Sequence, residues 1–235
     1  MLTFGGFPEP ILKQEASFLT QWSLSYQELL IQYHLKNFSK LQHTANISRL
    51  INALHNLPNS RLSCLKLSID IPHSPKTISS WVQLLQNFYY CFIINPWNHN
   101  ISYALTHEPR LYLLDWSNVV NPELKLKTLV ASHLFKAIHF WNEFCNGQYS
   151  LFYIRNKQKK EVDFLITQNL KPWLLIHVDP FTSTQLNDDL LYFHSKLNTS
   201  YALQLAPGIP YIDCDFRELK SPKIFPITTF LSQLI

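Results

Sequence analysis

Residues 151–178 read LFYIRNKQKKEVDFLITQNLKPWLLIHV, and their pattern indicates how the C-terminal half of the chain folds. Three apolar runs, at 151–155, 162–167 and 173–178, are separated by short polar turns, which predicts three successive strands. The run at 173–178 is nearly all apolar, as expected for a central strand that is buried on both faces.

Elements on both sides of this stretch extend the prediction to a mixed sheet with flanking helices. A helix with an apolar side is expected at 124–141, before the three strands. A later helix and strand are expected at 184–197 and 201–205. We therefore expect an α+β or α/β domain over residues 117–235, with a mixed sheet and flanking helices.

The N-terminal half is predicted to be mostly helical. The expected elements are helices at 14–35, 47–57, 63–69 and 76–88 and strands at 90–95, 101–105 and 110–114. The first helix forms a lead-in segment, 1–43, whose apolar face should pack on the next domain. Helix-turn-helix followed by a hairpin is the order of a winged helix, which we expect over residues 44–116.

Composition favours a soluble protein with a real core. The sequence is 46% hydrophobic and 15% charged, which argues against long disordered tracts. A formal net charge of +4 permits contact with nucleic acid without arguing for it. No signal-like or membrane-length apolar run occurs, and the four cysteines include no C-x-x-C pair. We therefore expect a cytoplasmic protein that does not associate with membranes.

The scarcity of glycine excludes several classes of function. Four glycines occur, at Gly5, Gly6, Gly147 and Gly208, so neither G-x-x-x-x-G-K-[ST] nor G-x-G-x-x-G can be written. We therefore expect no bound nucleotide. The nucleophile elbow G-x-S-x-G and the zinc motif H-E-x-x-H are also missing from the sequence. No resident cofactor is expected, and Mg²⁺ or Mn²⁺ enters only if the protein is a nuclease.

Charged residues gather where the predicted strands end. Glu161 and Asp163 lie two apart on one strand and should share a face, as should His177 and Asp179 on the next strand. Asp163, His177 and Asp179 could then converge and hold Mg²⁺ or Mn²⁺, as a metal-dependent phosphodiesterase requires. The alternative is a set of solvated acids at hairpin ends beside a hydrogen-bonded histidine.

Two segments are candidate nucleic-acid contacts. One is the basic turn at 156–160, which could touch phosphates or could form a solvated hairpin tip. The other is the helix at 76–88, which stands where a recognition helix would but offers no arginine for base readout. Binding to protein, or simple packing, is the alternative for this helix. The candidate contacts are Lys76, Thr77, Ser80, Arg155, Lys157, Lys159 and Lys160.

Several short motifs occur in an order that resembles a known family. They are Gly5-Gly6-Phe7-Pro8-Glu9-Pro10, Trp22, Tyr33, the segment 109–117 and Glu161-Val162-Asp163-Phe164. From about residue 4 to about residue 180 the chain is similar to the C-terminal region of a large family of prokaryotic AAA-type ATPases, catalogued as domain of unknown function 4143 (DUF4143). This resemblance implies a winged helix, then a PD-(D/E)XK nuclease-like fold, with the ATPase itself absent.

The nuclease motifs depart from the pattern of that family. Lys127 stands in place of its helix glutamate, and His177 and Asp179 stand in place of its second acid and its catalytic lysine. Glu161 and Asp163 match. An anion in place of a lysine beside Asp163 opposes phosphate binding, so the resemblance implies a damaged site. Activity would require Lys127 to act as a displaced lysine.

These observations give one functional hypothesis and two alternatives. We expect a non-catalytic, ATPase-less relative of AAA-type ATPases that binds double-stranded DNA or a partner protein through a winged helix and a degenerate nuclease-like domain. One alternative is a divergent metal-dependent DNA endonuclease, with Lys127, Glu161, Asp163, His177 and Asp179 as its active-site residues. The other is a subunit that docks on a separately encoded ATPase.

Overall fold

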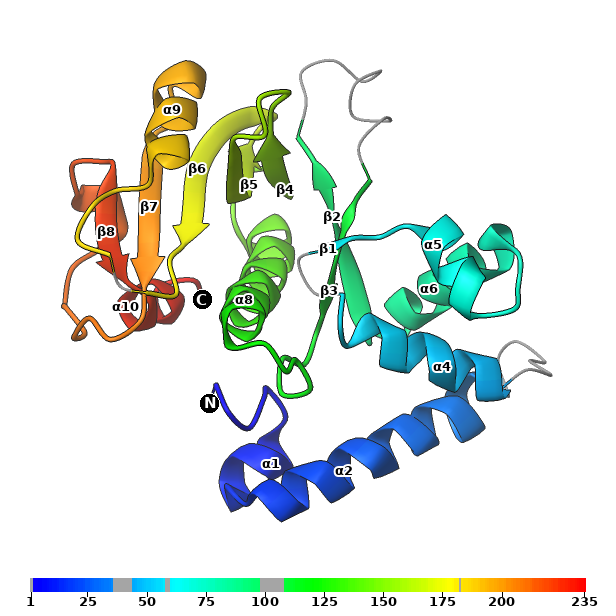
Figure 1. Ribbon diagram of the computed structural model, residues 1–235. Coiled ribbons are helices and arrows are strands. Elements are labelled where there is room, and N and C mark those ends of the chain that lie inside the picture. Colours follow the sequence, from blue (N-terminus) through cyan, green and yellow to red (C-terminus); the bar gives the residue numbers. More distant parts are fainter. Residues whose placement is uncertain (1, 36–43, 58–59, 98–107, 182) are drawn as a thin grey trace. The chain divides into compact units, whose positions relative to one another are not determined.

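The chain forms two compact units, each of which is described by itself. The computed structural model describes residues 2–35, 44–57, 60–97, 108–181 and 183–235. Unit 1 holds residues 1–93 and 110–129, and unit 2 holds residues 94–109 and 130–235. Helices and strands occur in both units (Figure 1), which confirms the predicted mixed class of α and β structure.

Unit 1 begins with two helices separated by one left-handed residue. Helix α1 spans Pro8–Lys13, and α2 spans Ala16–Leu29 and continues as the π-helical turn η1, Leu30–Leu35. Gln14 has a φ of 53°, and this left-handed conformation ends α1. Leu30, Ile31 and Leu35 of η1 are buried in one core with α4, whereas Leu29 and Tyr33 of the same predicted helix are exposed.

The next elements follow the order helix, strand, two helices, two strands. They are α4 (Thr44–Leu54), β1 (Ser60–Arg61), α5 (Cys64–Asp70), α6 (Pro75–Asn87), β2 (Cys91–Pro96) and β3 (Arg110–Leu113). The three predicted helices are confirmed, with shifted ends for α4. Strand β1 was not predicted because two residues carry no periodicity, and it forms by pairing antiparallel with β3. The strand predicted at 101–105 lies outside the described residues.

Helix α6 is fixed at both ends by its own sequence. At the N-terminus the Ser74 hydroxyl accepts a hydrogen bond from the Thr77 N–H at 3.1 Å. At the C-terminus Tyr89 is left-handed, with a φ of 55°, and the Tyr90 N–H donates to the Leu85 carbonyl at 2.9 Å. This is a Schellman motif, which satisfies carbonyls that the helix leaves free. The buried stripe of the helix is Ile78, Trp81, Val82 and Leu85.

The N-terminal glycines pack closely against the segment after β3. Gly5 has a φ of 79°, and a Cβ there would lie 2.1 Å from Asp115 Oδ1. The same oxygen accepts hydrogen bonds from the Gly6 N–H at 3.2 Å and from the Ser117 N–H at 3.1 Å. A Cβ on Gly6 would lie 3.1 Å from the Trp116 ring. Glycine is favoured at Gly5 because its φ is positive and because a side chain there would meet the carboxylate of Asp115.

A line of aromatic rings connects the N-terminal segment to the end of α6. The Phe7 ring centroid lies 4.6 Å from that of Trp22, and Trp22 stacks on Tyr26 at 5.2 Å. Tyr26 in turn lies 6.5 Å from Tyr90. His55, which follows α4, ends the line, because its Nε2 lies 2.6 Å from the Tyr90 hydroxyl oxygen.

We expect His55 to make the stability of unit 1 depend on pH. Burial lowers the pKa of His55 below its ordinary value of 6.5, and the charge of Asp115 opposes this shift only in part. The unfolded chain therefore takes up a proton at a higher pH than the folded chain does. The stability that neutral His55 contributes is present above the pKa that His55 has in the unfolded chain. This stability is lost as the pH falls below that pKa.

The urea concentration at the unfolding midpoint should therefore decrease as the pH is lowered from about 7.5 to about 5.5, a range that includes the pKa of histidine in the unfolded chain. A His55→Gln variant should show a smaller fall. Some pH dependence should remain in this variant, because burial also lowers the pKa of His194 in unit 2. Equal falls in the parent protein and in the variant would contradict the assignment to His55.

Unit 2 is built on a mixed sheet. Its elements are α8 (Pro122–Phe144, whose residues from 130 belong to this unit), β4 (Tyr149–Arg155), β5 (Glu161–Gln168), β6 (Lys171–Val178), α9 (Asp188–Leu197), β7 (Tyr201–Ala206), η2 (Phe216–Glu218), β8 (Lys223–Pro226) and α10 (Ile227–Ser232). Strands β4, β5 and β6 form an antiparallel meander, and β6, β7 and β8 run parallel. The last residues of β2 pair in parallel with β4.

Helix α9 lies against β5, β6 and β7 and closes one core of unit 2 (Figure 1). Strand β6 lies between β5 and β7, which confirms that the nearly all-apolar run forms a central strand. Strand β8 was not predicted, because its four residues end in a proline. In the part of the chain that the structure describes, no helix is long and apolar enough to cross a membrane. The core residues against α9 are Ile154, Val162, Leu165, Leu175, Leu190, Phe193 and Ala202.

Candidate functional site

Helix α6 turns a polar face to solvent in unit 1. Lys76, Ser80, Gln83 and Asn87 recur every three or four residues, so they lie on one side of the helix, and all four are exposed. The Gln83 side-chain amide donates a hydrogen bond to Asn87 Oδ1 at 3.3 Å. The face therefore offers one ammonium group and two carboxamides that are coupled one helical turn apart.

Two of the predicted contacts on this helix have partners within the helix itself. The Ser80 hydroxyl donates to the Lys76 carbonyl at 3.0 Å. The Thr77 hydroxyl lies 2.9 Å from the hydroxyl of Ser74 at the N-cap. Asn87, the last residue of the helix, was not among the contacts predicted on this face.

Exposed cations outnumber acids in the segment 44–87, which includes this helix. Between residues 44 and 87 the sequence holds a single acid, Asp70, at the end of α5. The cations of the same segment all lie on exposed positions, and they come from α4, β1, α5 and α6. They are Arg49, Arg61, Lys66 and Lys76.

In unit 2 the basic turn at 156–160 is a tight hairpin tip between β4 and β5. The Asn156 N–H donates to the Lys160 carbonyl at 3.0 Å, and the Lys160 N–H donates to Asn156 Oδ1 at 3.0 Å. Lys159 is left-handed, with a φ of 68°, a conformation that glycine usually supplies. This geometry leaves Lys157 and Lys159 exposed at the tip.

The other two predicted cations of this turn are paired with acids. Arg155 Nη1 lies 3.1 Å from Glu161 Oε2, across the register pair that closes the hairpin. Lys160 Nζ lies 3.9 Å from Asp189 Oδ1 and 4.6 Å from the centroid of the Tyr192 ring. The carboxylate of Glu161 therefore pairs with Arg155 across the two strands of the hairpin. Lys157 and Lys159 lie exposed at the tip.

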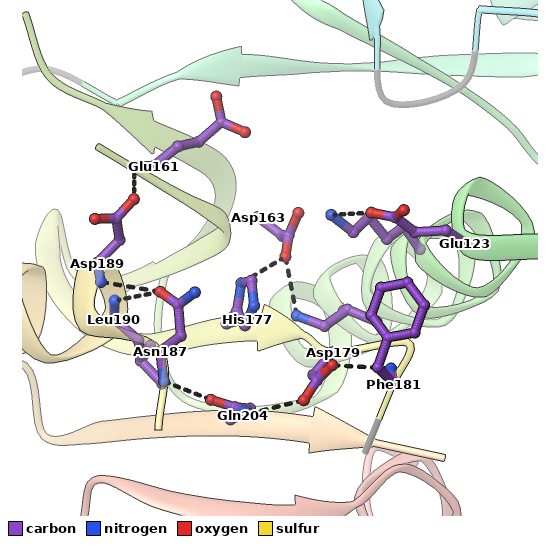
Figure 2. Close-up of polar contacts among 12 residues, drawn as sticks. Glu123, Glu161, Asp163, His177, Asp179, Phe181, Asn187, Asp189, Leu190 and Gln204 are labelled. Atoms are coloured by element: carbon purple, nitrogen blue, oxygen red, sulfur yellow. Dashed lines mark hydrogen bonds and ion pairs between the residues drawn. The ribbon is translucent and has the colours of Figure 1, made fainter. Parts of the chain in front are cut away.

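Asp163 and His177 form a pair where β5 begins and β6 ends (Figure 2). The two residues are the chain neighbours of Phe164 and Ile176, which face each other across the two antiparallel strands. His177 Nδ1 lies 3.1 Å from Asp163 Oδ2. The same oxygen accepts the Val178 N–H at 2.9 Å. The Asp163 side chain is 3% exposed and that of His177 is 20% exposed. A carboxylate that holds Nδ1 orients the imidazole, whose Nε2 can then move a proton or bind a metal.

Asp179 does not join this pair. Its carboxylate accepts hydrogen bonds from the Phe181 N–H at 2.9 Å and from the Gln204 amide at 3.0 Å (Figure 2). It also accepts a hydrogen bond from the Ser183 N–H at 2.7 Å. Burial by itself would raise the pKa of Asp179, but these hydrogen bonds outweigh burial and lower it. Both carboxylate oxygens thus hold the loop between β6 and α9.

The expected convergence of Asp163, His177 and Asp179 on one ion is therefore not found. Asp179 lies beyond the last residue of β6, so the alternation of a strand does not fix its direction. Among the residues that the structure describes, no group of three histidine, cysteine or acidic side chains is placed to share a metal ion.

Gln204 is a buried residue that sequence reasoning missed. It lies on β7, and its Oε1 accepts the Asn187 N–H at 2.7 Å. Its amide donates to Asp179 and, at 3.1 Å, to the Gln185 carbonyl. Asn187 in turn caps α9 by accepting the Leu190 N–H at 3.1 Å (Figure 2). The signal in the sequence is one glutamine within the apolar run 201–206.

Lys127, the candidate displaced lysine, lies on the part of α8 that belongs to unit 1. Its ammonium nitrogen is 3.4 Å from Glu123 Oε1, one turn earlier on the same helix (Figure 2). Its ammonium group therefore has an acidic partner on its own helix.

The fold and these sites define a mixed α and β protein whose first unit has a helix-turn-helix order and whose second unit has a hairpin and an Asp–His pair on a mixed sheet. Residues 1–121, more than half of the chain, match the family described as Domain of unknown function (DUF8612). The chain belongs to this family. No curated protein and no solved structure matches it.

The expected membership in DUF4143 is wrong, because the family that matches is a different one, and no relationship to AAA-type ATPases is found. The structure explains why the motifs were misleading. Gly5 and Gly6 make room for Asp115, and Trp22 stacks on Tyr26. Such motifs record local packing, which unrelated chains can share. The expectation of a separate ATPase partner had no basis other than this resemblance.

Proposed function

We propose that this chain is a non-catalytic DNA-binding protein whose segment from α4 to β3 docks on double-stranded DNA. The exposed polar face of α6 carries the proposal, within a segment that has the element order of a winged helix. In helix-turn-helix proteins the second helix of the motif enters the major groove, and neighbouring elements contact the backbone. In chain order, α6 follows α5 as the second helix of such a motif would.

Charge supports a nucleic acid as the partner. Phosphate contacts supply most of the affinity of such proteins, and exposed lysine and arginine make those contacts. In the segment 44–87 the exposed cations are Arg49, Arg61, Lys66 and Lys76, against the single acid Asp70. In unit 2 the hairpin tip adds two further exposed lysines, Lys157 and Lys159.

The geometry of unit 2 supports binding over cleavage. Both oxygens of Asp179 accept hydrogen bonds within its own loop, which leaves them poorly placed to hold a metal ion or to assist a water. The competing function is a divergent nuclease, and the observation in its favour is the pair of Asp163 and partly exposed His177.

We expect removal of phosphate contacts to weaken DNA binding and its dependence on salt. Fluorescence anisotropy with a labelled duplex should give a Kd that rises for Lys66→Ala/Lys76→Ala. The slope of log K against log salt should lose about 0.9 for each phosphate contact removed. A Lys220→Ala/Lys223→Ala variant removes two exposed lysines of unit 2 outside the proposed contacts and serves as the control. Unchanged binding in the first variant, or an equal loss in the control, would reject the proposed surface.

Plasmid nicking separates the binding protein from the nuclease. Purified protein with Mg²⁺ or Mn²⁺ should leave supercoiled plasmid intact, and an Asp163→Asn variant should behave in the same way. Nicking by the parent protein that Asp163→Asn abolishes would establish the nuclease instead, and His177 would then be the next residue to replace.

A further inference from the structure

We propose that the coupled carboxamides of Gln83 and Asn87 read adenine in the major groove, so that this protein prefers an A·T pair at the base-pair position that these side chains contact. The inference rests on the proposed function, because it assumes that α6 enters the groove. It goes beyond that function by naming the base that the helix selects and the residues that select it.

The first part of the argument is how the two side chains are held. They lie four residues apart on the exposed face of α6, and the Gln83 amide donates to Asn87 Oδ1 at 3.3 Å. This bond uses one proton of the Gln83 amide. The second proton and the carbonyl oxygen of Gln83 are left on the same planar group, which Asn87 orients.

The second part is the chemistry of the base edges. Adenine presents an acceptor at N7 and a donor at its N6 amino group in the major groove. One carboxamide matches both groups, because its N–H reaches N7 while its carbonyl oxygen accepts from N6. Guanine presents two acceptors, N7 and O6, so it would leave the carbonyl oxygen of Gln83 facing a second acceptor.

The third part is what the rest of the face offers. It holds no arginine, the side chain that most often reads guanine, and no carboxylate that could accept from cytosine. Lys76 lies two turns before Gln83, at the first turn of α6, where a cation is suited to a phosphate. The buried residues Ile78 and Trp81 lie on the side of α6 opposite to Gln83, and their burial prevents the helix from rotating about its axis.

Selection from a randomised duplex library, followed by anisotropy on the selected duplex, tests the inference. The selected sites should share an A·T pair, and its replacement by G·C should weaken binding by about tenfold or more. Gln83→Ala should abolish this difference, so that the duplexes with A·T and with G·C at this position bind with equal affinity. Gln83→Arg should shift the preference toward G·C, because arginine matches the two acceptors of guanine.

The control is Gln32→Ala, which removes an exposed carboxamide from η1 and should keep the full preference. Selection of sites with G·C at that position, or an A·T preference that survives in Gln83→Ala, would overturn the inference while DNA binding stands. A protein that binds neither library nor unselected duplex at low salt would overturn the proposed function, and the inference with it.

Discussion

The Gly5→Ala variant should lose about 2–5 kcal/mol of the free energy of unfolding of unit 1. An alanine at a φ of 79° costs about 1–2 kcal/mol by itself. Its Cβ would also lie 2.1 Å from Asp115 Oδ1, so the carboxylate has to move. The movement weakens the hydrogen bonds from the Gly6 and Ser117 N–H groups, at a further cost of about 1–3 kcal/mol.

Urea unfolding followed by tryptophan fluorescence measures this loss. The matched control is Gly208→Ala in unit 2, because Gly208 also has a positive φ, of 75°, on an exposed position. The control isolates the backbone cost, so it should lose about 1–2 kcal/mol. Equal losses in the two variants would show that the contact with Asp115 contributes nothing beyond the backbone conformation.

The Asp179→Ala variant should lose about 2–4 kcal/mol of the stability of unit 2. Its carboxylate accepts from two backbone N–H groups, those of Phe181 and Ser183, and from the amide of Gln204, which is 1% exposed. Removing the acceptor leaves the Gln204 amide with one hydrogen bond fewer, and a buried donor left unsatisfied costs about 1–3 kcal/mol, while each bond lost from the exposed residues Phe181 and Ser183 costs about 0.5–1.5 kcal/mol. Loosening of the loop before α9 adds to the loss.

Urea unfolding of this variant is compared with that of Asp213→Ala, which removes an exposed acid outside the helices and strands. The control should stay within about 0.5 kcal/mol of the parent protein. The result also bears on function. If Asp179 were a ligand in a metal site, its removal should relieve repulsion with Asp163 and should raise stability in the absence of metal, which is the opposite outcome.

Much of the fold could be predicted because its information is local. The three apolar runs between residues 151 and 178 became β4, β5 and β6, since short apolar runs bounded by polar turns have few other ways to bury their side chains. The buried side of α6 followed in the same way from its three-and-four spacing. The sequence also excluded a phosphate-binding loop, because such a loop cannot be built without glycines at fixed spacing.

The partners of the polar residues depended on the tertiary structure. The spacing of His177 and Asp179 suggested one shared site, but β6 ends at Val178 and Asp179 turns into a loop to meet Gln204, a residue far along the chain. The separation of Gly5 from Asp115 in sequence likewise hid the contact that requires the glycine. Periodicity fixes which side of an element is buried, whereas a hydrogen-bond partner depends on strand register and loop path, and these are set only when distant segments pack together.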